Sequence, residues 1–159
     1  MRQDYLFLIE YCRVFAYAAA RAPDLETIRG FGALLHSTAS TEMDLHRAYA
    51  AELGIPSEEL EVETTSGATR EYANFLLQAG ATAEFPVIAA SLLPCMWAFA
   101  ENGQALAYLP GARDRRYGAW IRTYSDAEFV ALSDCVETSS TTSPRLPTTR
   151  PDLAWRSHS

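Results

Sequence analysis

The sequence predicts an all-α protein, folded as an antiparallel bundle of helices, and three observations support this. Apolar residues recur at steps of three and four over most of residues 3–132, which is the period of an amphipathic helix. No stretch shows the alternation of apolar and polar residues that a half-buried strand would have. The breaks between the periodic segments are short, which favours antiparallel neighbours.

The first third of the chain predicts two helices. Residues 3–22 carry apolar side chains at helical spacing until Pro23 interrupts them. The next break comes only at a Gly-Ile-Pro sequence, so residues 24–53 predict one long or once-bent helix. Residues 57–62 are expected to form an acidic linker or a single turn.

The middle of the chain predicts two further helices. Residues 66–78 have a helical pattern, and Gly80 is expected to end that helix. Residues 82–102 form the next one. Pro94 lies well inside it, where its missing N–H and its ring should bend the helix.

Two shorter helices are expected after this point. A loop at 108–111 precedes a helix around 115–123. Ser125 and Glu128 have the spacing of a capping box, in which each side chain bonds the backbone N–H of the other. We therefore expect Ser125 to open the last helix.

The composition changes abruptly at Ser133. Among the last 27 residues eleven are Ser or Thr and three are Pro, with no apolar period. Such a segment has too few apolar side chains to form a core. A chain of 159 residues suits one domain with a core. We expect a helical domain over residues 1–132 and a disordered tail over 133–159.

Charge and cysteine content exclude several classes of partner. The net charge of −7 argues against a nucleic-acid-binding surface, which needs clustered Lys and Arg. Cys12, Cys95 and Cys135 lack metal-ligand spacing and are an odd number, so neither a zinc site nor a disulfide framework is predicted. The start lacks the apolar run of a signal peptide, and no segment is expected to approach a transmembrane span in length and apolarity. A cytoplasmic protein is expected.

Two residues could carry chemistry on local pattern alone. Cys95 follows Pro94, which cannot donate to the carbonyl of Ala90, so a free polar group would lie beside the thiol. A buried structural cysteine is the more common outcome of such a pattern. Asp4 shares a helical face with Phe7 and Tyr11, where a carboxylate could accept hydrogen bonds from an amidine-like ligand. It could equally be a solvated aspartate in the first turn of a helix.

The remaining polar and aromatic residues are weaker signals. Aromatic side chains at helical spacing usually belong to the core; those of interest are Tyr72, Phe99 and Tyr124. Histidines without a partner motif predict neither a metal site nor a Cys-His pair; these are His36, His46 and His158.

Taken together, several of these residues resemble the signature stretches of the TenA family, of the thiaminase II type. The stretches are Gln-Asp-Tyr-Leu-Phe-Leu at 3–8, Leu-Leu-Pro-Cys-Met-Trp at 92–97 and Trp-Ile-x-x-Tyr at 120–124. Their order and separations agree with the family, as does the position of Tyr72. The resemblance covers roughly residues 3–132.

This resemblance implies a haem-oxygenase-like helical bundle without haem, metal or other cofactor. It implies an enzyme that hydrolyses the bond at the 5-methylene carbon of a 4-amino-2-methylpyrimidine and yields hydroxymethylpyrimidine in thiamin salvage. The leaving group would be ammonia from 4-amino-5-aminomethyl-2-methylpyrimidine or the thiazole of thiamin. A homotetramer is typical of the family.

The family's functional residues carry over by position. Cys95 would be the nucleophile, and Asp4 would bind the amidine face of the pyrimidine and act as a catalytic residue. The substrate-binding side chains would be aromatic: Tyr72, Tyr124, Phe7, Tyr11 and Phe99.

Three departures from the family pattern weigh against activity. Phe99 stands where many relatives have a tyrosine. The usual leading helix and the closing helix with its catalytic glutamate are not recognisable, so we expect a bundle truncated at both ends. The alternative is therefore a non-catalytic pyrimidine-binding or regulatory protein, or an inactive remnant. A haem-oxygenase-like oxidoreductase is disfavoured because the first helix has no histidine.

Overall fold

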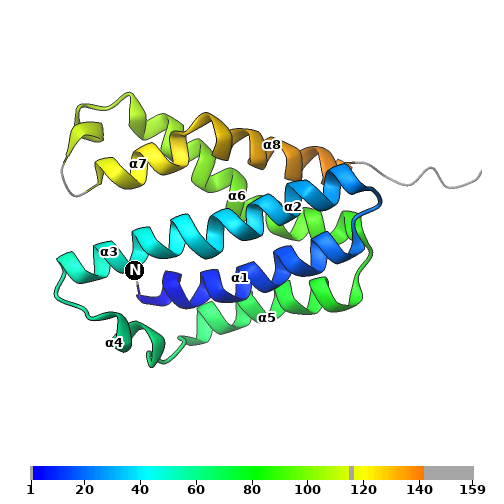
Figure 1. The fold of residues 1–159 in the computed structure, drawn as a ribbon, viewed down its shortest axis with the longest axis horizontal. Helices are drawn as coiled ribbons and strands as arrows, with labels where there is room; N and C mark the ends of the chain where they lie inside the picture. Colours follow the sequence, from blue (N-terminus) through cyan, green and yellow to red (C-terminus); the bar gives the residue numbers. More distant parts are fainter. Residues whose placement is uncertain (1, 115–116, 142–159) are drawn as a thin grey trace, which may run out of the picture.

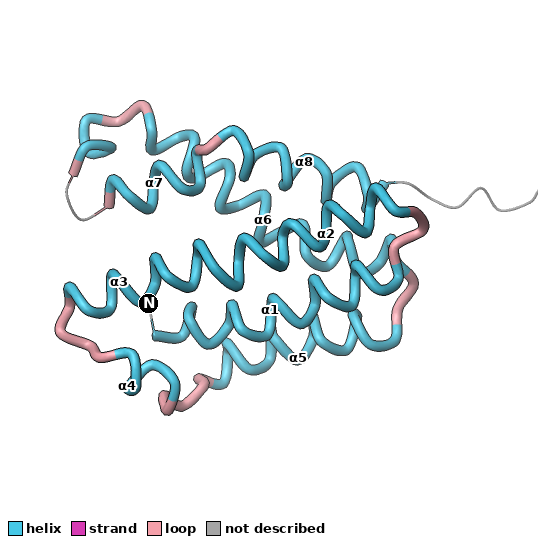
Figure 2. The backbone as a smooth tube through the Cα atoms, viewed as in Figure 1, coloured by secondary structure: helices cyan, strands magenta, loops and turns pink. Residues whose placement is uncertain are grey.

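The computed structural model describes residues 2–114 and 117–141, and within these ranges the chain is helical with short connections (Figure 2). The all-α prediction is thereby confirmed. The helical segments in chain order are α1 (Arg2–Arg21), α2 (Leu25–Ser37), the π-helical turn η1 (Thr38–Glu42), α3 (Met43–Glu52), α4 (Ser57–Glu61), α5 (Gly67–Thr82), α6 (Phe85–Ala107), the 3₁₀ turn η2 (Pro110–Arg113), α7 (Gly118–Ser125) and α8 (Ala127–Thr141).

The long helices form an antiparallel bundle. The continuous helix α2–η1–α3 runs back along α1, α5 runs forward again, and α6 crosses behind them (Figure 1). α1 packs against α2 and α5, whereas α6 packs mainly against α7 and α8. The core lies where α1, α2 and α6 meet, and burying each of its large apolar side chains contributes roughly 1.5–3 kcal/mol. Its fully buried members include Val14, Phe15, Phe31, Ile88 and Leu92.

The long helix expected over residues 24–53 is present and contains a π turn. Asp24 caps its start by accepting a hydrogen bond from the N–H of Thr27 at 2.8 Å. Gly54 follows its end with φ of 74°, a left-handed conformation in which a side chain would be strained. π turns are frequent at functional sites. Here Thr38 and Glu42 at the two ends of the turn are both buried.

α6 holds Pro94 in its interior, and its ribbon changes direction near the middle of the helix (Figure 1). The missing N–H and the bulk of the proline ring explain this bend. By length and composition α6 is also apolar enough to cross a membrane, which corrects the expectation that no segment approaches a span. In this structure it packs against α1, α5, α7 and α8.

α5 extends beyond its expected end. It begins as predicted, with the side chain of Ser66 accepting from the N–H of Thr69, but it continues through Gly80 to Thr82. Gly80 is buried within the helix, and a Cβ there would lie 2.9 Å from the ring of Tyr17. The glycine therefore permits close packing of α5 on α1 rather than ending the helix.

The C-terminal helices also differ from expectation. Ser125 is the last residue of α7, and the extended backbone of Asp126 separates the two helices. The carbonyl of Asp126 accepts the N–H of Val130, so α8 begins later than the capping-box pattern indicates.

The prediction of a disordered tail is wrong for residues 133–141, which continue α8. Burial explains the difference, because Ser133 and Val136 lie against the bundle and Val136 joins the main core. Local composition therefore gives way to tertiary packing here. The rest of the predicted tail lies outside the described residues.

Gly103 provides a test of how tightly α6 and α7 pack. A Cβ on Gly103 would lie 2.5 Å from the carbonyl carbon of Tyr124, a contact with backbone that no rotamer change can relieve. Gly103→Ala should therefore lower the free energy of unfolding by about 1–3 kcal/mol, measured by urea denaturation. The matched control is Gly32→Ala, because a Cβ at Gly32 meets nothing within 4 Å. The control should be neutral or stabilising, by up to about 1 kcal/mol, and equal losses in both variants would contradict tight packing at Gly103.

Candidate active site

A pocket at the junction of α1, η1, α6, α7 and α8 brings together side chains far apart in the sequence. Its cavity volume is about 20 Å³, room for about one water molecule, so a ring-sized ligand would need its side chains to move apart. The lining is largely apolar with a few polar groups that converge on it. The lining residues are Asp4, Phe7, Leu8, Glu42, Cys95, Met96, Phe99, Tyr124 and Phe129.

Asp4 lies in the first turn of α1, and its neighbours anchor that turn. The Gln3 amide donates to the carbonyl of Thr64 at 3.0 Å and accepts from the N–H of Ser66 at 2.7 Å. Arg2 forms ion pairs with Glu59 and Glu63 at 2.8 Å. These contacts join α1 to the segment before α5, and they hold Asp4 at the pocket even though it is close to the start of the helix.

The carboxylate of Asp4 is paired with His46 from α3. Asp4 Oδ2 lies 2.7 Å from Nε2 of His46, and Nδ1 of the same ring lies 2.8 Å from the carbonyl oxygen of Glu42. Both ring nitrogens therefore face acceptors, which favours the doubly protonated ring. Burial lowers the pKa of His46, but the hydrogen bonds to Asp4 and to the Glu42 carbonyl outweigh it, so the net shift of the pKa is upward.

The side chain of Glu42 is a second carboxylate in the pocket, and it is only 7% exposed. Its Oε2 accepts the hydroxyl of Thr38 at 2.6 Å. Burial raises the pKa of Tyr124 far above its ordinary value, and the charge of Glu42 together with a hydrogen bond between the two side chains raises it further. Tyr124 therefore remains a protonated hydroxyl that holds Glu42 in place.

Cys95 lies on α6 just after the proline, half-buried against α1. Burial raises the pKa of its thiol to about 12, a hydrogen bond with Tyr11 lowers it, and the charges of Asp4 and Glu42 raise it again. The Tyr11 hydroxyl also donates to the carbonyl of Leu92 at 2.8 Å. Since a hydroxyl has one proton, Tyr11 accepts the S–H of the neutral thiol and can turn its proton toward a thiolate.

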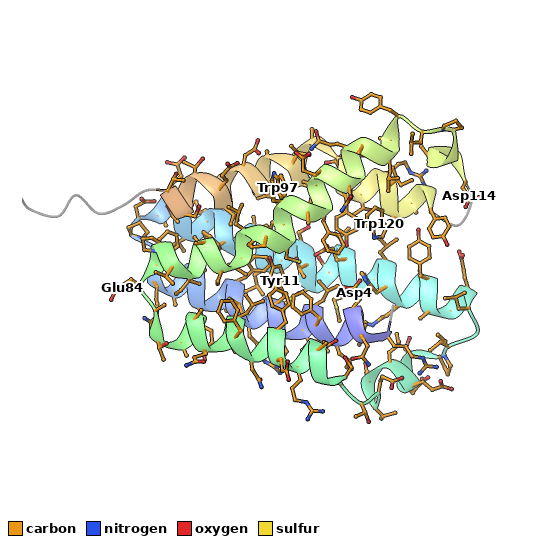
Figure 3. The ribbon with its side chains drawn as sticks, turned by 180° about the vertical axis from the view of Figure 1, so that it is seen from behind. Asp4, Tyr11, Glu84, Trp97, Asp114 and Trp120 are labelled. Carbon is orange, nitrogen blue, oxygen red and sulfur yellow. The ribbon has the colours of Figure 1, made fainter. Side chains whose placement is uncertain are left out.

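Aromatic rings surround these polar groups. On α1, Phe7 stacks on Tyr11 with centroids 5.2 Å apart, and Tyr72 from α5 also stacks on Phe7 at 5.3 Å. Tyr124 contacts three further rings at 4.7–5.0 Å; these belong to Phe99, Trp120 and Phe129. Asp4 and Tyr11 follow one another along α1, and Trp120 lies across from them on α7 (Figure 3).

Most of the residues singled out from the sequence meet in this pocket. Asp4, Phe7, Cys95, Phe99 and Tyr124 line it directly. Two lie behind that first layer. Tyr11 is buried and forms a hydrogen bond with Cys95. Tyr72 is 38% exposed and contacts the site by stacking on Phe7.

Sequence reasoning missed Glu42, Thr38 and His46. They recur every four residues, the spacing that places side chains on one helical face. This spacing is the only feature of the sequence that could have indicated that the three side chains act together. In the structure the face that they share is directed toward α1. No group of three potential metal ligands occurs among the residues that the structure describes.

Comparisons with known proteins agree with this site. The chain matches the model of the TENA/THI-4/PQQC family over residues 1–140. It is 44% identical over 135 residues to the aminopyrimidine aminohydrolase of Halalkalibacterium halodurans, which covers 84% of this chain and 60% of the relative. It is 35% identical over 130 residues to the protein of the same name from Helicobacter pylori, covering 81% and 60%.

A solved structure shows the same fold. The crystal structure of a TenA family transcription regulator from Silicibacter sp. TM1040 superposes with a TM-score of 0.78 at 28% identity, covering 87% of this chain and 61% of that one. The chain thus spans about 60% of the length of the curated relatives it matches. The family match extends past residue 132 into α8. The chain belongs to the TENA/THI-4/PQQC family.

Proposed function

We propose that this chain hydrolyses an aminopyrimidine of the thiamin type by nucleophilic catalysis through Cys95. The favoured substrate is 4-amino-5-aminomethyl-2-methylpyrimidine, with thiamin as a second substrate, and the product is hydroxymethylpyrimidine. The observation that carries the proposal is that Cys95 and Asp4, which is paired with His46, line one small pocket with aromatic walls. The names of the two bacterial relatives support the same substrate class.

Each group has a role that its surroundings support. Asp4 Oδ2 is held by His46, which leaves the other carboxylate oxygen for the amino group and ring nitrogen of the pyrimidine. The aromatic lining of the pocket, which includes Phe7, Phe99 and Tyr124, suits a flat heterocycle. Cys95 adds to the electron-poor ring, the bond between the methylene carbon and its nitrogen breaks, and water takes the place of the leaving group. Tyr11 stabilises the thiolate by turning its proton toward sulfur.

The direct test is turnover by the purified chain. The chain is incubated with aminomethylpyrimidine and, separately, with thiamin, and hydroxymethylpyrimidine is quantified by chromatography. Release of the product above the rate without protein supports the proposal. Absence of product from both substrates, in a chain shown to be folded by circular dichroism, would overturn it.

A second candidate is binding of the pyrimidine without turnover. It is favoured by the pKa of Cys95, about 12, which leaves the resting thiol neutral near pH 7. Calorimetric binding of hydroxymethylpyrimidine without any hydrolysis would identify this case. The two candidates share the pocket and differ only in whether the thiol loses its proton when substrate is bound.

We also propose that the chain self-associates, as the family resemblance implies. Large apolar side chains are more than half exposed on α5 and α6, namely Phe75, Val87 and Trp97. Exposed apolar groups of this kind often mark protein contacts. Light scattering of the purified chain measures the mass, and a monomer would contradict this part of the proposal.

A further inference from the structure

We propose that Glu42 is a catalytic residue that carries a proton from the Cys95 thiol to the amine that leaves. This inference rests on the proposed hydrolysis and assigns a role to a residue that the sequence motifs do not include. Glu42 would be the general acid that protonates the leaving amine. A neutral amine leaves a carbon only when it receives a proton, because the alternative leaving group is an amide anion.

Glu42 is the titratable group of the pocket that remains once the others have roles. Among the nine lining residues, four can exchange a proton: Asp4, Glu42, Cys95 and Tyr124. Asp4 is paired with His46 at 2.7 Å and faces the amidine of the ring. Cys95 is the nucleophile. The Tyr124 hydroxyl is held by Glu42 and deeply buried, which makes it a fixed donor rather than an acid.

Two hydroxyl groups hold the side chain of Glu42 in place. Thr38 donates to Oε2 at 2.6 Å, and the hydroxyl of Tyr124 is a second hydrogen-bonding partner. No arginine of the described residues forms an ion pair with Glu42. A carboxylate held by hydroxyls and not by a guanidinium retains the ability to accept a proton and return it. The titratable groups that interact with it from neighbouring helices are Asp4, Tyr11, Cys12, His46, Cys95 and Tyr124.

The proton balance closes within the pocket. Glu42 takes the S–H proton as the sulfur electron pair forms the bond to the ring carbon. The carbon–nitrogen bond then breaks, its electron pair goes to nitrogen, and Glu42 returns the proton so that ammonia departs. Water then adds to the methylene carbon and gives a proton to the Glu42 carboxylate. When the carbon–sulfur bond breaks, the sulfur takes that proton back, which restores the thiol and the carboxylate.

Thiamin provides an internal comparison, because its leaving group needs no proton. The thiazolium nitrogen carries a positive charge, and the bond electrons that it receives yield a neutral thiazole. Both substrates need Glu42 to take the thiol proton, and the amine substrate needs it again as the acid. A variant without a carboxylate at position 42 should therefore lose more activity on the amine substrate than on thiamin. A general disturbance of the pocket would affect both substrates to a similar extent.

The experiment measures kcat for both substrates in the full chain and in Glu42→Gln, which keeps an acceptor for Thr38 and Tyr124. We expect kcat for aminomethylpyrimidine to fall by about 100-fold or more. For thiamin the loss should be at least ten times smaller. Glu10→Gln is the matched control, because Glu10 pairs with Arg13 and does not line the pocket, and it should leave both rates unchanged.

Chemical rescue provides a second measurement that does not depend on thiamin turnover. In Glu42→Ala, formate should restore at least part of the amine activity, because a small acid can occupy the space that is left. Equal losses for both substrates in Glu42→Gln, or no rescue of Glu42→Ala by formate, would overturn the role of Glu42 while hydrolysis by the unaltered chain stands. Failure of the unaltered chain on both substrates would overturn the proposed function and this inference with it.

Discussion

Replacing Cys95 with serine is expected to lower kcat for pyrimidine hydrolysis by at least roughly 10³-fold, because a hydroxyl is a far weaker nucleophile than a thiolate. The fold should survive, since serine is close in size to cysteine and Tyr11 can donate to its oxygen. Binding of hydroxymethylpyrimidine, measured by calorimetry, should stay within about threefold, because recognition is assigned to Asp4 and the aromatic walls.

Cys12 supplies the matched control for this variant. It is a free cysteine on the same helix as Asp4, half-buried, and burial raises the pKa of its thiol to about 11. It does not line the pocket. Cys12→Ser should leave kcat unchanged. A Cys95→Ser variant that retains full kcat would remove the nucleophile from the proposed mechanism and leave only the pocket.

The helical architecture could be predicted from the sequence because most of its signals are local. The apolar pattern and its breaks predicted the helices that contain α1, α2–α3, α5 and α6, and Asp24 and Ser66 cap helices where expected. Errors arose where packing decides the outcome. Gly80 lies inside a helix because Tyr17 packs against it, and residues 133–141 are helical because Val136 reaches the core. Neither contact is visible in a window of neighbouring residues.

The residues of the candidate site likewise fall into those that local sequence indicates and those that only tertiary contacts bring together. Cys95 and Asp4 belong to contiguous motifs, so a family resemblance found them. Glu42 and His46 belong to no such motif, and their roles depend on contacts with α1. For example, His46 pairs with Asp4, which lies 42 residues away in the sequence. In the sequence, His46 has no partner motif and does not differ from the other two histidines, so nothing indicates a functional role. Its importance appears only when α3 is placed against α1 and both of its ring nitrogens meet acceptors.

Asp4→Asn is the second substitution with a large expected effect. The amide cannot act as a charged acceptor for the amidine face, so the affinity for hydroxymethylpyrimidine should fall by about 10- to 100-fold in calorimetry. Asp44→Asn is the control, because Asp44 is exposed and pairs with Arg47 on the surface of α3. Unchanged affinity in Asp4→Asn would show that the carboxylate does not bind the pyrimidine.

The same variant should change how stability depends on pH. In the unaltered chain the pKa of His46 is raised on folding, so this group contributes stability below its unfolded value of about 6.5 and loses that contribution as the pH rises through the folded-state pKa. In Asp4→Asn the amide can donate to Nε2 of a neutral ring while Nδ1–H still donates to the Glu42 carbonyl. We therefore expect the variant to be less stable than the unaltered chain at pH 5.5, and the difference to shrink or reverse by pH 8.5. Urea unfolding at the two pH values measures this difference, and a loss of stability independent of pH would mean that His46 is not charged in the folded protein.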